Sequence, residues 1–425
     1  MKILSIETSC DETAVALLEI KEFKKVTEVK ILGNALLSQT AIHAPMGGVV
    51  PSLAKREHSK NLVPILEVAL KEAKHKKNKT SGKNFNRRTE EKLKKMLAHE
   101  PDLYDAFIKF VPKIQKPKID VIAVTSGPGL EPALWVGINF AKALSLIWNK
   151  PIVAVNHMEG HVFSAMLGKC VAQNANRKTL IAKRVTDKAK KNFYDVTSYT
   201  LHATRFPLLS LLISGGHTEL VSGKKFGSYK IIGETRDDAV GEAYDKAARM
   251  IGLPYPGGPE ISKLAEKARK KNVLSEYSLP RPMINSKDLD FSFAGLKTAL
   301  FYTIKKNFKE KNTGGYDIPP ISKMMLAKEF EDAVAEVLVS KVREAIEKTK
   351  AKTFAVGGGV IANKNIRAEL SKLIKIRFPK VNLFLPSQDL TTDNAVMIAI
   401  AGYFKFKKTK SGSKKITANG NWRLS

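Results

Sequence analysis

Apolar runs divide the chain into two blocks with the same predicted order of elements. The first block contains strand-like runs at 2–7, 13–20, 31–39, 121–125 and 152–155, with helical patterns at 50–73 and 133–148. The second block also begins with three strand-like runs, at 208–214, 218–222 and 229–235, and later has a strand at 353–356. Strands that alternate with helices indicate mixed sheets covered by helices. The repeated order predicts an α/β protein of two similar lobes with a cleft between them.

Two lysine-rich segments interrupt this order. Residues 74–118 contain fourteen Lys/Arg and five Asp/Glu, and the apolar stretch 103–111 predicts a helix inside this segment. A second basic segment covers 169–206. Both lie between core elements, so we expect surface insertions. We expect residues 1–151 and 394–408 to form the N-terminal lobe, 152–393 the C-terminal lobe, and 409–425 a basic tail.

Composition narrows the class of protein. Only two cysteines occur in 425 residues, which excludes a disulfide-rich scaffold and fits a reducing compartment. The apolar stretch 133–148 is too short to span a bilayer, so we expect a cytoplasmic protein without membrane contact. A formal charge of +31 indicates a polyanionic partner such as nucleic acid, with a solvated lysine-rich surface as the alternative.

Two histidines form a candidate metal site. His157 and His161 are four residues apart directly after the predicted strand 152–155, so both imidazoles face one side of a helix and can meet one zinc or iron ion. The alternative is an ordinary pair on a helix surface or in a core. Asp393, just before the apolar helix 395–404, is a candidate third ligand, with a helix N-cap as the alternative. Glu159 is about 200° around the helix from His157, which argues against a zinc peptidase.

Hydroxyl-rich and glycine-rich turns suggest a phosphate site. The turn 7–13 carries Ser and Thr hydroxyls beside Asp11 and Glu12. This turn suits an anion only if a cation intervenes or a carboxylate handles a proton; an ordinary polar hairpin is the alternative. Glycine-rich turns at 214–216 and 357–359 directly follow buried strands, as nucleotide-cradling turns do. No Walker loop or dinucleotide fingerprint is present.

Taken together, these motifs resemble one family, the tRNA threonylcarbamoyladenosine-forming transferases (TsaD in bacteria). The matching segments occur in family order from residue 1 to about 405, outside the basic segments: 6–13, 47–51, 156–161, 212–218, 237–246, 255–259, 290–297, 357–363 and 392–394. The resemblance is closest to the bacterial branch. It implies two ribonuclease-H-like lobes of the actin/Hsp70/sugar-kinase type around a central cleft.

The resemblance also implies a reaction and its participants. The threonylcarbamoyl group of threonylcarbamoyl-AMP would move to N6 of adenosine 37 in tRNAs that read codons beginning with A, forming the modified nucleoside t6A. The implied cofactor is one divalent metal ion, with Fe²⁺ favoured and Zn²⁺ as the alternative. The implied partners are tRNA, a TsaB-like paralogue, a TsaE-like ATPase and a threonylcarbamoyl-AMP synthase that supplies the substrate.

Site residues follow from the resemblance by motif. His157, His161 and Asp393 would be the metal ligands, and Asp11 and Glu12 would be catalytic. The adenylate would contact a further set of eight residues: Leu212, Ile213, Ser214, Gly215, Gly216, Asp245, Gly258 and Asn363. Relatives often have Asp where this chain has Ser262, which puts a carboxylate contact to the ribose in doubt there. A nucleotide-binding scaffold of actin-like fold and a metallopeptidase are the rival interpretations.

Overall fold

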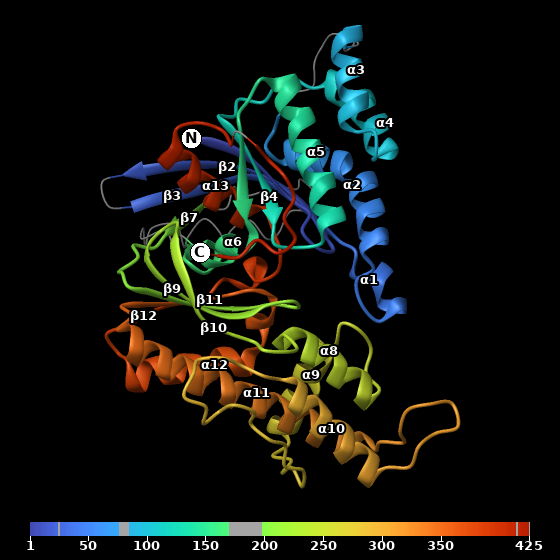
Figure 1. The fold of residues 1–425 in the computed structure, drawn as a ribbon, viewed down its shortest axis with the longest axis vertical. Coiled ribbons are helices and arrows are strands. Elements are labelled where there is room, and N and C mark those ends of the chain that lie inside the picture. Colours follow the sequence, from blue (N-terminus) through green and yellow to red (C-terminus); the bar gives the residue numbers. More distant parts are fainter. Residues whose placement is uncertain (24–25, 76–84, 170–197, 414, 425) are drawn as a thin grey trace, which may run out of the picture.

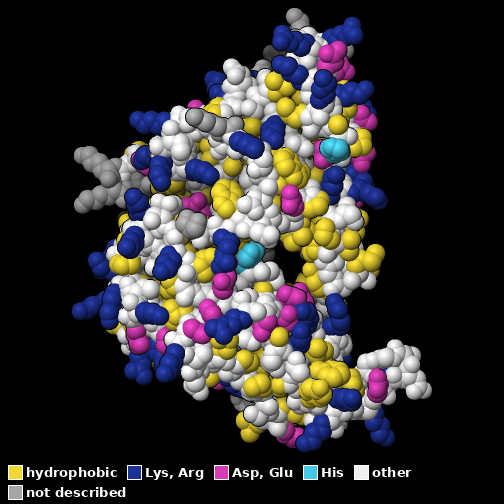
Figure 2. Space-filling model, in the orientation of Figure 1, with side chains coloured by type: hydrophobic (Ala, Val, Ile, Leu, Met, Phe, Trp, Pro, Cys, Tyr) yellow, Lys and Arg dark blue, Asp and Glu magenta, His cyan; other side chains and the backbone are white. Residues whose placement is uncertain are grey.

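Two α/β lobes make up the described part of the chain. The computed structural model describes residues 1–23, 26–75, 85–169, 198–413 and 415–424, and Figure 1 shows the two lobes one above the other. Each lobe is built on one sheet, and Figure 2 shows a hollow between the lobes on this face of the molecule. No helix among the described residues is both long and apolar enough to cross a membrane.

The first sheet has seven strands in the order β5-β4-β1-β2-β3-β7-β6. Its strands are β1 (Lys2–Glu7), β2 (Glu12–Phe23), β3 (Val26–Ser38), β4 (Val121–Gly127), β5 (Ile152–Asn156), β6 (Leu167–Lys169) and β7 (Ser198–Leu201). The helices and 3₁₀ turns in this part of the chain are α1 (Thr40–His43), η1 (Ala44–Met46), α2 (Pro51–Glu72), α3 (Arg87–Met96), α4 (Pro101–Phe110), η2 (Val111–Lys113), α5 (Glu131–Trp148) and α6 (His157–Ala165). Apolar side chains of α2 and α5 cover one face, and those of α6 and α13 (Ala395–Thr409) cover the other. The fully buried strands β4 and β5 begin with unbroken apolar runs, 121–124 and 152–155, because helices lie on both faces of the sheet.

The second sheet has five strands in the order β10-β9-β8-β11-β12. Its strands are β8 (Leu208–Ile213), β9 (Thr218–Lys225), β10 (Ser228–Glu234), β11 (Thr353–Gly357) and β12 (Asn382–Phe384). The accompanying helices and 3₁₀ turns are α8 (Val240–Ile251), α9 (Gly257–Lys270), α10 (Ala294–Asn307), α11 (Pro320–Thr349), η3 (Gly359–Ala362), α12 (Lys364–Arg377) and η4 (Gln388–Leu390). Helices α8 to α12 gather on the outer face of this sheet in Figure 1.

Both sheets share one strand plan. In each sheet, three consecutive strands pair antiparallel. The first of these three also pairs parallel with a later strand, and that strand pairs parallel with the strand after it. The resulting orders are β3-β2-β1-β4-β5 and β10-β9-β8-β11-β12. This is the ribonuclease-H-like order. The predicted α/β architecture of two similar lobes is therefore confirmed.

The first sheet continues past residue 151, where we expected the boundary between the two lobes. β5 pairs with β4 in parallel register, with Ile122 opposite Ile152, and β7 pairs with β3. The crossover from β4 through α5 returns the chain to the same sheet, as a parallel β-α-β unit does. Residues 152–156, 167–169 and 198–201 thus lie in the first sheet, and the chain enters the second sheet only at β8.

The first basic segment is largely part of the N-terminal lobe. Its expected helix is confirmed as α4, and α3 precedes it. Leu93, Leu97, Leu103 and Phe107 are buried in the same core as the α2 and α5 side chains. The expectation of a surface insertion is therefore wrong for 87–113, because apolar residues recur at helical spacing within the basic composition. Residues 76–84, and 170–197 of the second basic segment, lie outside the described residues.

The C-terminal segment returns to the middle of the molecule. The amide of Asn419 donates to the carbonyl of Ser126 at 2.9 Å, and the side chain of Asn156 donates to the carbonyl of Trp422 at 3.0 Å. Lys405 Nζ lies 5.0 Å from the ring centroid of Trp422. The end of the expected basic tail is therefore bound to the carboxyl edge of the first sheet.

Candidate functional site

The histidine pair lies where β5 passes into α6. Asn156 ends the strand and caps the helix, because its Oδ1 accepts from the amides of Met158 at 2.9 Å and Glu159 at 3.2 Å. His157 and His161 then occupy successive turns of α6, with ring centroids 4.7 Å apart and planes at 85°. The predicted strand and the shared helix face are confirmed.

Asp393 completes the cluster from the far end of the chain. Its Oδ1 lies 3.3 Å from Nε2 of His157 and 3.1 Å from Nε2 of His161. The N-cap of α13 is the next residue, Asn394, whose side chain accepts from the amide of Met397 at 2.9 Å. The N-cap interpretation of Asp393 is therefore wrong. The side chain of Asn394 caps α13, and the carboxylate of Asp393 faces the two histidines.

These three side chains fit a divalent metal ion. One ligand atom from each lies within 4.8 Å of the others. His161 is fully buried, yet neither of its ring nitrogens makes a hydrogen bond of normal geometry with any described residue. Two imidazoles and one carboxylate are a ligand set that iron and zinc both accept. Glu159 instead lines a separate cavity with Tyr229 and Lys405, away from the cluster.

Glu7 supports the cluster from behind, and sequence reasoning did not single it out. Its Oε2 lies 3.3 Å from Nδ1 of His157 and accepts from Thr125 Oγ1 at 2.5 Å, while its Oε1 accepts from the amide of Ser9 at 2.6 Å. A carboxylate on the second nitrogen of a ligand histidine fixes the ring and its tautomer. The signal in the sequence was a Glu at the last position of the predicted strand 2–7.

Charges within the cluster shift its proton affinities in opposite directions. Burial disfavours a charged imidazole at His157, but Asp393 and Glu7 outweigh it and raise its pKa well above the ordinary value. Burial lowers the pKa of His161. Burial, followed by repulsion from His157 and His161, lowers the pKa of a further histidine, His217, to about 4. In the absence of a metal ion, burial keeps His161 and His217 neutral near pH 7, whereas the two carboxylates favour a proton on His157.

The acidic turn between β1 and β2 lies beside this cluster. Burial, followed by repulsion from Asp393 and Asp11, raises the pKa of Glu12 well above its ordinary value. Thr40 Oγ1 lies 3.4 Å from Asp11 Oδ2, and His58 Nε2 lies 2.9 Å from the carbonyl oxygen of Cys10. The fold thus brings the turn to the metal cluster, and the catalytic role of its two carboxylates stays a prediction.

A cavity of about 550 Å³ opens in the second lobe. Four of the eight residues expected at the adenylate line it: Gly215, Asp245, Gly258 and Asn363. The carboxylate of Asp245 accepts from the amide of Gly257 at 2.7 Å, which fixes the start of α9 at the cavity wall. The cavity size is within the range of small-molecule sites.

The other four expected residues do not line this cavity. Leu212 and Ile213 are fully buried within β8. Ser214 closes the turn to β9, with its amide donating to the carbonyl of His217 at 2.9 Å and its hydroxyl accepting from the amide of His217 at 3.1 Å. Gly216 belongs to the same turn. These residues shape the turn, and Gly215 alone of that stretch reaches the cavity.

A buried carboxylate organises the cavity wall at Ser262. Glu331 on α11 is 1% exposed, and its Oε1 accepts from Ser262 Oγ at 2.8 Å and from Asn363 Nδ2 at 2.6 Å. Arg269 forms an ion pair with the same carboxylate. Ser262 occupies the position where relatives often have Asp, and in this chain the carboxylate of Glu331 accepts a hydrogen bond from it. Sequence reasoning missed Glu331, whose signal was an acidic residue on the buried face of a long helix.

Comparison with known families finds one whose sequence model matches this chain. The family model of TsaD, tRNA N6-adenosine threonylcarbamoyltransferase, matches residues 30–82, 101–192 and 179–400. That match spans most of the chain, and the family is one of acyltransferases.

Solved structures of other proteins show more remote similarity. Full-length HypF in its phosphate- and nucleotide-bound form matches with a TM-score of 0.44 and 12% sequence identity. The match covers 72% of this chain and 42% of the HypF chain. Component A of the Acidaminococcus fermentans (R)-2-hydroxyglutaryl-CoA dehydratase matches at 0.41 and 11% identity, over 95% of this chain and 98% of that one. YeaZ from Pseudomonas aeruginosa matches with a TM-score of 0.23 and 12% sequence identity, and the match covers 54% of this chain and 65% of the YeaZ chain. The family match rests on the sequence model, and on that basis the chain belongs to the TsaD family, the tRNA N6-adenosine threonylcarbamoyltransferases.

Proposed function

We propose that this protein transfers the threonylcarbamoyl group from threonylcarbamoyl-AMP to N6 of adenosine 37 in tRNAs that read codons beginning with A. Membership of the family supports a role in making this modified nucleoside. The finer statement, which names the donor and the acceptor atom, is supported by how the metal cluster and the large cavity are connected.

One glycine-rich turn joins the two sites. Gly359 lines the large cavity, while a Cβ at Gly357 would lie 2.6 Å from the carbonyl oxygen of His161. Gly358 has φ of +96°, and a Cβ there would lie 2.3 Å from the carbonyl oxygen of Ile213. Only glycine permits this backbone and this close approach. An adenylate whose nucleoside occupies the cavity would therefore direct its phosphate along the turn toward the histidines.

The residues present divide the chemical work. Bound by His157, His161 and Asp393, a divalent metal ion would polarise a carbonyl or phosphate oxygen, with Fe²⁺ favoured and Zn²⁺ as the alternative. The cavity holds the nucleoside, so the reactive carbonyl is positioned before the acceptor arrives. Asp11 and Glu12 lie at the same end of the cleft, and Glu12, whose pKa burial raises, can give up a proton there.

The charge of the protein supports tRNA as the partner. The net charge of +31 attracts a polyanion, and Figure 2 shows Lys and Arg side chains over both lobes. A TsaB-like paralogue, a TsaE-like ATPase and a threonylcarbamoyl-AMP synthase complete the proposed machinery. We place the reaction in the cytoplasm, where tRNA and the adenylate are made.

The test is mass spectrometry of tRNA incubated with threonine, bicarbonate, ATP, the partner proteins and this protein. The wild type should form the modified nucleoside. The double variant His157→Ala/His161→Ala should lose both bound metal and product, whereas His99→Ala, at an exposed site, should keep both. Absence of product with the wild type would contradict the proposed function, and full metal occupancy in the double variant would contradict the ligand assignment. A nucleotide-binding scaffold would bind AMP without forming product.

A further inference from the structure

A second cavity, of about 300 Å³, lies beside the metal cluster. Met158, which follows the ligand His157, and His217, which the two ligand histidines influence electrostatically, are both in its wall. The rest of the lining comes from the first sheet, the β9–β10 hairpin and the C-terminal segment: Pro128, Glu219, Glu234, Gly420, Asn421, Trp422, Arg423 and Leu424. This space is distinct in its lining from the larger nucleotide cavity.

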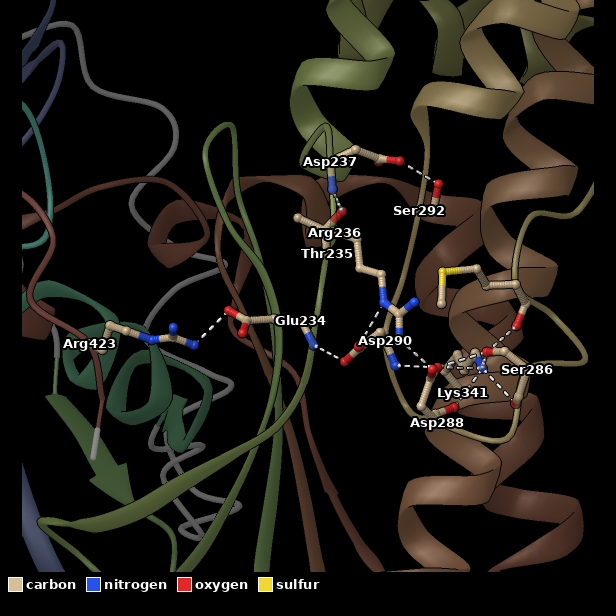
Figure 3. Close-up of polar contacts among 11 residues, drawn as sticks. Glu234, Thr235, Arg236, Asp237, Ser286, Asp288, Asp290, Ser292, Lys341 and Arg423 are labelled. Carbon is tan, nitrogen blue, oxygen red and sulfur yellow. Dashed lines mark hydrogen bonds and ion pairs between the residues drawn. The ribbon is translucent and has the colours of Figure 1, made fainter.

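The C-terminal segment 419–424 forms one wall and is attached to both lobes. On the side of the first lobe, the carbonyl of Gly420 accepts from the amide of Gly129 at 3.1 Å, and Asn419 and Trp422 are held as described above. On the side of the second lobe, Arg423 Nη2 lies 2.6 Å from Glu234 Oε2. Figure 3 shows Glu234 held in turn at its backbone, where its amide donates to Asp290 Oδ1 at 3.1 Å. The wall is therefore defined by specific contacts.

Two glutamates face this cavity from opposite strands. Glu219 on β9 and Glu234 on β10 are direct cross-strand partners, so their side chains lie on the same face of the hairpin. Like charges in that arrangement repel each other. Arg423 relieves the repulsion at Glu234, with which it forms an ion pair.

Glu219 differs from its neighbour in that one of its oxygens is buried without a hydrogen-bond partner among the described residues. It is 8% exposed, and its buried Oε2 accepts no hydrogen bond from any described residue. Burial raises the pKa of this carboxyl group above its ordinary value. A buried acceptor without a donor is unfavourable, so such a group in a native fold requires an explanation, and a ligand that supplies the donor is one.

We propose that this cavity receives the purine of the acceptor nucleotide and that the carboxylate of Glu219, which lines the cavity, accepts a hydrogen bond from the exocyclic amine of the purine. The inference rests on the proposed function, in which that amine is the nucleophile. Adenine presents an N–H donor at this position and a 6-keto purine presents an acceptor, so a carboxylate selects the amino base. Trp422 adds an aromatic wall on which a base can stack.

The transfer step balances with Glu219 as the proton acceptor. The amine nitrogen forms a bond to the carbamoyl carbon, and the bond from that carbon to the phosphate oxygen breaks. The electron pair of the broken bond stays on AMP, which leaves as the anion. The proton lost by the amine passes to the carboxylate of Glu219 and later to water.

The first test compares Glu219→Gln with Glu276→Gln, a matched change at an exposed position. With saturating tRNA, Glu219→Gln should lower the single-turnover transfer rate by roughly 10²–10⁴-fold, the usual contribution of a positioned proton acceptor. Hydrolysis of the donor without tRNA, bound AMP and thermal stability should stay at wild-type levels. An unchanged transfer rate would overturn the inference, while absence of transfer by the wild type would contradict the proposed function on which it rests.

The second test measures recognition without chemistry. Wild-type protein loaded with AMP should bind a tRNA with adenosine at position 37 more tightly than the same tRNA with inosine there, because the inosine O6 faces a carboxylate. Glu219→Gln should abolish or reverse this preference, since an amide can also donate. Equal preferences in the two proteins would show that Glu219 does not contact the base.

Discussion

Glu7 and His157 are coupled across the end of β1: Glu7 Oε2 lies 3.3 Å from Nδ1 of His157, whose other nitrogen faces Asp393. Because Thr125 and the amide of Ser9 also donate to Glu7, its carboxylate has a fixed position. The histidine ring is thereby oriented before any metal arrives.

Replacing Glu7 by Gln should weaken metal binding without removing a ligand. The amide keeps the size of the side chain but not its charge, and loss of such a partner typically costs 10–100-fold in metal affinity. Competition with a chelator, followed by metal analysis, measures the change. Glu19→Gln, on the neighbouring strand β2, is the control and should bind metal like the wild type. Equal affinities in all three proteins would show that Glu7 does not orient the ligand.

Glu331→Gln should weaken AMP binding by about tenfold and leave metal binding intact. The charged acceptor holds both Ser262 and Asn363 at the cavity wall, and hydrogen bonds to charged groups contribute about 1.5–3 kcal/mol. Isothermal titration with AMP measures the affinity. Arg269 keeps its second partner, Asp332, so the fold should tolerate the change.

The control for Glu331 is Glu336→Gln on the same helix, where the carboxylate pairs with Arg281 outside the cavity lining. This variant should bind AMP normally. Loss of affinity in both variants would indicate a general effect on α11 instead of a local role for Glu331.

The lobes and the histidine pair were predictable because local patterns determine them. β1, for example, has the predicted bounds Lys2–Glu7, and the spacing of His157 and His161 directly implies a shared helix face. The approach of Asp393 was ambiguous in the sequence, because an aspartate before a helix is a common cap. Only the cap made by Asn394 distinguishes the two interpretations.

Contacts between distant segments were not predictable in the same way. Glu219 lies in a strand whose pattern gives no sign that one oxygen lacks a partner, because that follows from the cross-strand register and from the return of the C-terminal segment. Glu331 similarly meets Ser262 through the packing of α11 against α9. Such relationships depend on tertiary structure, and periodicity carries no information about them.

The buried histidine His58 should make stability depend on pH. Its Nδ1 lies 2.7 Å from Thr13 Oγ1, and burial lowers its pKa below the ordinary value. In the unfolded chain the imidazole takes up a proton near pH 6.5, whereas in the folded protein it stays neutral to lower pH. The unfolded state therefore binds more protons, and stability is lost as pH falls below about 6.5.

The measurement is the urea midpoint of the wild type and His58→Gln at pH 7.5 and 5.5. The wild type should lose more stability between the two values than the variant, because the other histidines are common to both proteins. His99→Ala removes an exposed imidazole and should behave like the wild type. A variant with the same pH dependence as the wild type would show that His58 does not contribute.

Helix α3 offers a test of whether the first basic segment contacts tRNA. Leu93 anchors the helix in the core, while Arg88, Lys92 and Lys95 are exposed. Changing these three residues to Gln preserves the anchor and removes three positive charges. If each contacts a phosphate, the plot of log affinity against log salt should become shallower by about 0.7–0.9 per lost contact between 50 and 200 mM salt.

The matched control changes Lys305, Lys306 and Lys309, in and after α10 of the other lobe, to Gln. Both triple variants have the same net charge, so a slope that changes only in the α3 variant assigns the contact to this helix. Equal changes in both would reflect the overall charge of the protein, and unchanged slopes would show that the lysine-rich face of α3 is solvated surface. Melting temperatures should match the wild type in either case, because exposed charges of this kind contribute little to stability.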